Sequence, residues 1–160
     1  ARLQEARTQQ RGKSWLAVEC GGRGLLFPLR EAGEIFAVST LMPVPHTHRW
    51  FLGVANLRGH LHGVVDLASF LGVKAADAPR DQARLVGFNA ALELNCTLLV
   101  ERLSGLRSET QLTADTSAPA DSAERPAFVG ALYRDAAGRA WQELNLAELA
   151  ADETFLRVVG

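Results

Sequence analysis

This sequence has few cysteines, no excess of charge of one sign and no long apolar runs. Cys20 and Cys96 are the only cysteines, too few and too far apart for a secreted disulfide framework or a four-thiolate zinc site. We expect two buried free thiols in a reducing compartment. The 17 basic and 18 acidic side chains nearly cancel, which argues against a nucleic-acid binder with its basic patch. No stretch approaches the roughly 18 consecutive apolar residues of a transmembrane helix.

Motifs of catalysis and nucleotide binding are also missing. The sequence contains no G-x-S-x-G nucleophile elbow, no P-loop and no G-x-G-x-x-G, the patterns that present a nucleophile or cradle a phosphate on a turn. Glu31 and Glu34 are close in sequence, but paired carboxylates act as acid and base only where a cleft separates their pKa values. A solvated pair is the simpler interpretation. The sequence therefore predicts neither an enzyme nor a cofactor.

What the sequence does contain is a series of short apolar segments that alternate with a period of two and are separated by turn residues, a pattern typical of β-strands. We expect strands over residues 15–20, 25–28, 35–40, 51–57, 62–66, 84–89, 92–100, 128–133 and 140–144. Asp66 and Asn145 are expected to cap the short helices that follow two of these strands. Residues 108–125 show little periodicity, and we expect a mobile loop there.

Two stretches of the chain resemble each other. Residues 51–68 and residues 128–147 both read as strand, turn, strand and capped helix. Their spacing differs by only a few residues, which a longer hairpin turn in the second copy absorbs. The repeat indicates a pair of small β-barrels related by pseudo-symmetry. Chance similarity over so few identities is the alternative.

All four histidines fall in one window, as His46, His48, His60 and His62. Residues two apart in a strand point to the same face, so each His-x-His could bring two imidazoles together as the start of a metal site. Such a site needs further ligands, and the nearby Asp66 is better explained as a helix cap. We therefore expect polar histidines around a turn and no metal, with a small metal-binding β-barrel protein as the alternative function.

A longer motif resembles a known family. Residues 53–67 read G-V-A-N-L-R-G-H-L-H-G-V-V-D-L and are followed by Phe70-Leu71-Gly72. This run is similar to the signature of the CheW-like family, the coupling proteins of bacterial chemotaxis, which reads approximately G-V-x-N-L-R-G-x-x-x-P-V-x-D-L. The resemblance extends from residue 15 to about residue 149. Gly63 replaces the family proline, a departure that bears on the receptor partner more than on the fold.

At two places the sequence resembles one member of this family in particular. Trp50 ahead of the motif and the sequence of residues 155–159 look like the CheW-like protein of the type IV pilus (twitching-motility) chemosensory system. The resemblance implies a mainly β fold of two five-stranded SH3-like β-barrels packed about a shared hydrophobic core, with short helices. We expect residues 1–13 to be a polar N-terminal extension left by a trimmed leader, residues 14–152 a single domain of two pseudo-symmetric barrels, and residues 153–160 a C-terminal tail.

The function implied by the resemblance is that of a non-enzymatic adaptor. It would bridge the cytoplasmic tip of a transmembrane chemoreceptor to the regulatory domain of a histidine kinase, and the output would be type IV pilus motility. The adaptor would be cytoplasmic, at membrane-associated receptor arrays, and would meet the membrane only indirectly through the receptor. No nucleic acid, cofactor or metal is expected.

Six positions carry the implied partner-binding surface. Arg58 falls on the family's Asn-Leu-Arg-Gly arginine, with Asn56 in the same motif, and this arginine is associated with receptor coupling. Gly53 and Gly130 fall on glycines whose replacement is expected to disturb the same surface.

The other two positions are assigned to a receptor groove. Ala32 lies near a family position that is usually a larger aliphatic residue, and Leu106 matches a groove position in the second half of the chain. Such a groove would accept an amphipathic helix of the receptor tip. Arg58 could pair with a carboxylate or a helix C-terminus of the partner, or could brace its own turn; both interpretations stay open here.

Overall fold

The computed structural model describes residues 13–38, 40–45, 48–72, 80–115 and 126–159. The predicted N-terminal extension, apart from Lys13, lies outside these residues, and so do residues 116–125 of the loop predicted for residues 108–125. The described part of that loop instead contains a 3-10 turn, Glu109–Gln111, and a short strand, Thr113–Ala114. Within the described part of the chain, no helix has the length and apolar character needed to cross a membrane.

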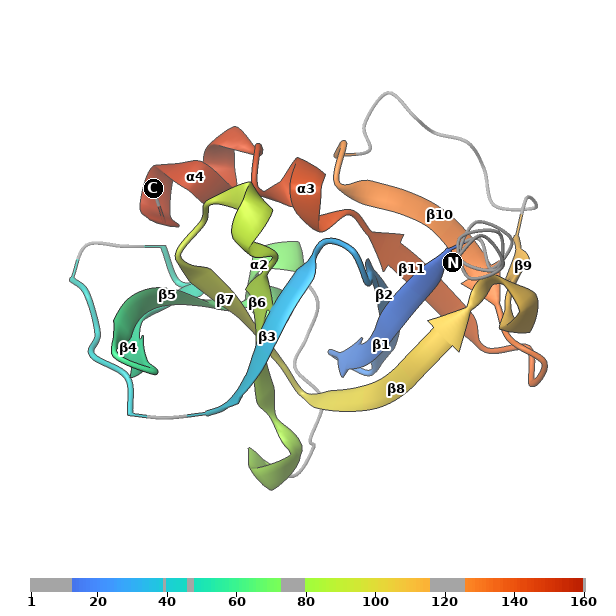
Figure 1. Cartoon of the computed structure of the whole chain (residues 1–160), viewed down its shortest axis with the longest axis horizontal. Coiled ribbons are helices and arrows are strands. Elements are labelled where there is room, and N and C mark those ends of the chain that lie inside the picture. The colour runs from blue at the N-terminus through green and yellow to red at the C-terminus, as the bar shows by residue number, and fades with distance from the viewer. Residues whose placement is uncertain (1–12, 39, 46–47, 73–79, 116–125, 160) are drawn as a thin grey trace, which may run out of the picture.

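Strands of two sheets make up about half of the described chain (Figure 1). The first sheet has the order β8 (Arg102–Ser108), β1 (Ser14–Cys20), β2 (Arg23–Pro28), β11 (Ala140–Leu144), β10 (Val129–Arg134) and β9 (Thr113–Ala114). The second has the order β3 (Ala32–Ala37), β6 (Arg84–Phe88), β7 (Cys96–Val100), β5 (His60–Asp66) and β4 (Phe51–Leu57). The helices are α2 (Leu67–Leu71), α3 (Leu146–Leu149) and α4 (Glu153–Val159), with 3-10 turns η1 (Arg80–Gln82), η2 (Ala90–Leu92) and η3 (Glu109–Gln111).

The two sheets share one topology. The order β8-β1-β2-β11-β10 corresponds to β3-β6-β7-β5-β4, and the parallel pairs, β2 with β11 and β7 with β5, occupy equivalent places. In both sheets the chain that leaves the edge strand crosses to the opposite edge: β9 pairs with β10 after β8, and Met42 bridges Val54 of β4 after β3. The fold is thus the expected pair of SH3-like barrels. In the first barrel, the crossing segment adds β9 as a sixth, short strand.

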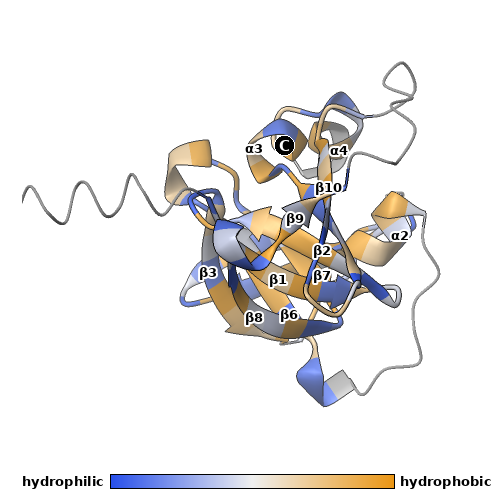
Figure 2. Cartoon of the chain, turned by 90° about the vertical axis from the view of Figure 1, so that its right-hand side faces the viewer, coloured by the Kyte–Doolittle hydropathy of each residue, from blue (hydrophilic) through white to orange (hydrophobic). Residues whose placement is uncertain are grey.

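Apolar side chains of both barrels meet in one shared core. Its fully buried members come from the first sheet, such as Val18 and Phe27, and from the second, such as Val65 and Leu98. A smaller cluster around Trp15 fills the first barrel. The apolar colouring of the central strands β1 and β2 in Figure 2 reflects this burial. The alternating sequence pattern predicted these strands because each of them buries apolar side chains.

Some predicted boundaries were wrong. The third strand spans Ala32–Ala37 rather than 35–40. Strand β7 begins at Cys96 rather than at residue 92, because Asn89 accepts a hydrogen bond from the Ala91 amide (2.9 Å) and starts the 3-10 turn η2. Strand β8 was missed. Its pattern is irregular, since Gly105 has a φ of +97° and the pairing with β1 shifts register beside it.

The helix ends also differ from expectation. Asp66 and Asn145 occupy the predicted N-cap positions, but neither side chain makes a cap hydrogen bond. The segment assigned to a C-terminal tail forms α4 instead. Its Phe155 is completely buried and packs with its ring 6.2 Å from that of Trp50. This segment is therefore part of the shared core.

Candidate functional site

The turn between β4 and β5 presents Arg58. Arg58 and Gly59 have φ angles of +54° and +85°, the pair of positive values that a tight type I′ hairpin turn requires. The Asn56 Oδ1 accepts a hydrogen bond from the Gly59 amide at 3.0 Å. Asn56 and Gly59 thus hold the backbone of the turn, and the Arg58 side chain, 72% exposed, does not brace it.

Arg58 reaches the edge strand β3 instead. Its Nε lies 3.0 Å from Glu34 Oε2, and its guanidinium lies 5.9 Å from the centre of the Phe36 ring. Both charged side chains are more than half exposed, so the pair contributes at most about 1 kcal/mol to stability. The sequence interpretation of Glu31 and Glu34 as a solvated pair was incomplete, because each carboxylate has a partner distant in the chain.

A cavity of about 330 Å³ opens beside this ion pair, between β3, β5 and the end of β6. His60 and His62 of β5 both line it, as the two-residue spacing predicted. Burial lowers the pKa of His62, and the neighbouring His60 lowers it further while Glu34 raises it. The cavity therefore favours a neutral imidazole at His62.

The histidine window does not form a metal centre in the described part of the chain. No group of three or more His, Cys, Asp or Glu side chains there is arranged to hold a metal ion. His48 stacks on Trp50 with ring centres 5.1 Å apart. His46 lies outside the described residues. The alternative of a metal-binding protein has no support from this geometry.

Gly53 is buried in β4, and Gly130 is half-buried in β10. Gly53 has a φ of +134°, and a Cβ there would overlap the Met42 carbonyl that closes the second barrel. At Gly130 a Cβ would overlap the Glu143 carboxylate. Each glycine is required by a close approach, so its replacement would disturb a surface only through packing.

Ala32 and Leu106 lie on the edge strands of the two sheets, β3 and β8, which flank β1 on the face seen in Figure 1. Leu106 is 61% exposed, whereas Ala32 is half-buried against the shared core. Leu29 and Ile35, just before Ala32 and within β3, are also exposed apolar residues. Exposed apolar side chains thus lie on both edges, and Glu34 on β3 carries the ion pair with Arg58.

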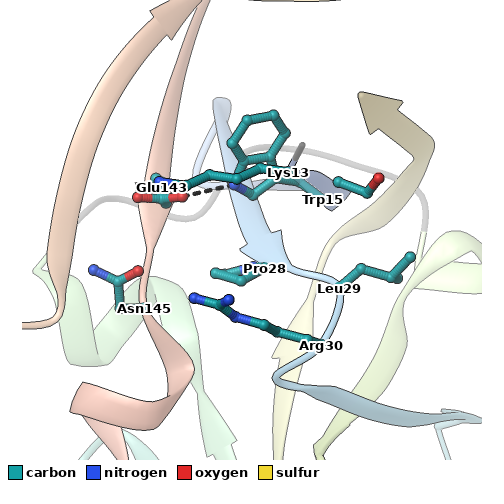
Figure 3. A pocket seen from close by; sticks show the side chains of 8 residues that line it. Lys13, Trp15, Pro28, Leu29, Arg30, Glu143 and Asn145 are labelled. Carbon is teal, nitrogen blue, oxygen red and sulfur yellow. Dashed lines mark hydrogen bonds between the residues drawn. The ribbon is translucent and has the colours of Figure 1, made fainter. Parts of the chain in front are cut away.

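A second cavity, of about 400 Å³, lies between the start of β1, the end of β2 and the strand–helix junction at Asn145 (Figure 3). Within it the buried Glu143 accepts a hydrogen bond from the Trp15 indole at 2.6 Å. Leu29 and Arg30 form the wall on the β2–β3 connection, opposite Asn145. This cavity borders the segment that leads into Ala32.

Comparison with known proteins agrees with this fold and sequence. The CheW-like domain profile matches residues 14–154, nearly all of the described chain. The chain belongs to the CheW-like domain family.

The chain is also similar to individual proteins of known name or structure. The chain is 28% identical over 153 residues to Protein PilI of Pseudomonas aeruginosa, a match that covers 94% of this chain and 83% of PilI. It is 33% identical over 66 residues to chemotaxis protein CheW of Rhizobium meliloti, covering 41% of this chain and 43% of that protein. The crystal structure of the scaffolding protein TtCheW from Thermoanaerobacter tengcongensis superposes with a TM-score of 0.63 at 14% identity, over 82% of this chain and 88% of that one.

Proposed function

We propose that this protein is a non-enzymatic adaptor that couples the cytoplasmic tip of a transmembrane chemoreceptor to the regulatory domain of a histidine kinase. The observation that carries the proposal is the similarity to PilI along 94% of the chain, on a fold whose signature motif forms an exposed turn. The adaptor works in the cytoplasm at membrane-associated receptor arrays. The relationship to PilI favours the type IV pilus over the flagellum as the output.

The receptor-binding surface in this proposal is the face formed by the edge strands β3 and β8. Leu106 is largely exposed and Ala32 lies half-buried at the start of β3. Apolar side chains of this kind accept the apolar face of an amphipathic helix, with polar residues at the rim. Leu29 and Ile35 extend the apolar part of this surface.

Arg58 supplies the charged contact at the rim. Its turn is held by Asn56 and Gly59, so the guanidinium is free to exchange the exposed Glu34 carboxylate for one of the partner. An exchange of this kind costs little, because an exposed ion pair contributes little stability. Gly53 and Gly130 support the surface by allowing the close packing beneath it.

The test uses the purified receptor tip and the purified kinase regulatory domain. Calorimetry should detect binding of each to the wild-type protein, and Leu106→Ala should weaken binding of the receptor tip. Absence of receptor binding by the wild type would contradict the proposal. For the output, deletion of the gene should abolish twitching and leave swimming intact; the reverse result would assign the protein to a flagellar system.

A further inference from the structure

The connection between β2 and β3 is tied to both barrels. The Leu29 amide donates to the Ser14 carbonyl of the first barrel at 2.9 Å. At the end of β6, the Asn89 amide donates to the Glu31 carbonyl at 2.8 Å and the Asn89 side-chain amide to the Arg30 carbonyl at 3.1 Å. This short segment therefore has hydrogen bonds to both of the bodies that it joins.

The Glu31 side chain adds a third attachment. Its Oε1 accepts a hydrogen bond from the Ala147 amide at 3.1 Å, in the first turn of α3. Amides in the first turn of a helix have no partner within the helix, and Asn145 at the N-cap position makes no cap hydrogen bond. Glu31 thus supplies the acceptor from a distant part of the chain.

This attachment joins the two walls of the cavity in Figure 3. One wall is Leu29 and Arg30 of the connection, and the other is Asn145 before α3. Helix α3 is itself anchored, because Leu146 and Leu149 are completely buried in the shared core. Loss of the Glu31 carboxylate would free the connection from α3 while leaving both barrels intact.

We propose that Glu31 is a positioning residue for receptor coupling. By holding the β2–β3 connection against α3, it sets the placement of one barrel relative to the other, and with it the placement of Leu29 and Ala32 relative to β8. This inference rests on the proposed function for its effect on receptor binding, but the placement of the barrels can be measured without a receptor.

The experiment compares three variants. Glu31→Ala removes the acceptor, whereas Glu31→Gln keeps an oxygen that can accept from the Ala147 amide. Asp152→Ala is the matched control, because Asp152 Oδ2 accepts from the Phe155 amide at the start of α4, also at 3.1 Å. Spin labels at the exposed positions Leu61 and Ala136, one in each barrel, report the distance between barrels; Cys20 and Cys96 are buried and should not react.

Well below the melting temperature, Glu31→Ala should broaden or shift the distance distribution and weaken receptor-tip binding about fivefold. Glu31→Gln should restore both, and Asp152→Ala should leave both as in the wild type even where it lowers the melting temperature. An unchanged distance distribution in Glu31→Ala would overturn the inference, as would an equal change in Asp152→Ala. Failure of the wild type to bind the receptor tip would count against the proposed function and leave the distance test of Glu31 valid.

Discussion

Arg58 in the β4–β5 turn and Glu34 in strand β3 form an ion pair, with Nε and Oε2 3.0 Å apart. The two strands β3 and β4 are at opposite edges of the second sheet, and the chain closes that sheet through the bridge between Met42 and Val54. The ion pair connects edge strand β3 with the turn that follows the opposite edge strand, β4. It holds Arg58, the charged residue of the family motif, against strand β3, which begins at Ala32 of the proposed receptor surface.

Replacing Arg58 with asparagine should uncouple the receptor without unfolding the protein. Asparagine tolerates the positive φ of this turn, and the lost ion pair is exposed, so the free energy of unfolding should change by less than about 1 kcal/mol. Receptor-tip binding should weaken about tenfold or more. Thermal melting and calorimetry on the same sample measure the two effects.

Arg134→Asn is the control, because Arg134 also forms an ion pair, with Asp115 at 2.8 Å, but lies on β10, outside the strands β3 and β8 of the proposed surface. It should bind the receptor tip as the wild type does. Unchanged binding by Arg58→Asn would remove Arg58 from the receptor surface. A joint collapse of stability and binding would make Arg58 structural and leave Ala32 and Leu106 as the receptor contacts.

Alanine substitutions at two leucines should distinguish a core position from a surface position. Leu98 is completely buried and Leu106 is 61% exposed. Leu98→Ala should cost about 2–5 kcal/mol of unfolding free energy, as large-to-small changes in a core do. Leu106→Ala should change it by less than about 0.5 kcal/mol and act on receptor binding instead. Urea denaturation measures both, and a cost below about 0.5 kcal/mol for Leu98→Ala would show that its side chain is not in the core.

Gly53→Ala should destabilise the second barrel. The new methyl group would overlap the Met42 carbonyl, and the φ of +134° is unfavourable for alanine. We expect a loss of at least about 2 kcal/mol. Gly138→Ala is the control for backbone strain alone, since Gly138 has a φ of +83° and an added Cβ there would meet no other atom within 4 Å, so it should cost only about 1 kcal/mol. Equal costs in the two variants would contradict a tight approach at Met42.

Acidification should destabilise the protein in part through His62. Burial and the neighbouring His60 hold the pKa of His62 below its ordinary value, so the unfolded chain binds this proton more readily. Neutral His62 makes its full contribution to the free energy of unfolding above about pH 6.5. This contribution is lost as the pH falls through that value toward the lower pKa of His62 in the folded protein. Melting temperatures between pH 8 and pH 5 should therefore fall less steeply in His62→Gln than in the wild type or in His48→Gln. Parallel curves for all three proteins would contradict this account.

The sequence predicted the parts of the molecule that depend on local pattern. The β4–β5 hairpin was predicted because its strands alternate and Gly59 marks the turn. The internal repeat predicted two barrels, since both copies end in the same strand, turn, strand and helix. Strand β8 was missed because Gly105 introduces a positive φ that interrupts the alternation.

The contacts that complete the site were beyond the reach of sequence reasoning. Glu34 meets Arg58 only because the second barrel closes, and Glu31 meets Ala147 only because α3 packs against the β2–β3 connection. Barrel closure depends on non-local strand pairing, on which hydrophobic periodicity carries no information. The same limit applies to Gly53 and Gly130, whose close approaches to the Met42 carbonyl and the Glu143 carboxylate were not predicted.

The most direct test of the account is whether this protein joins a receptor to a kinase. Receptor tips presented on vesicles are sedimented with the kinase regulatory domain, in the presence and absence of the protein. The account predicts that the kinase domain sediments with the receptor vesicles only when the wild-type protein is added, and much less with Arg58→Asn. Equal sedimentation of the kinase domain with and without the wild-type protein would contradict the central claim.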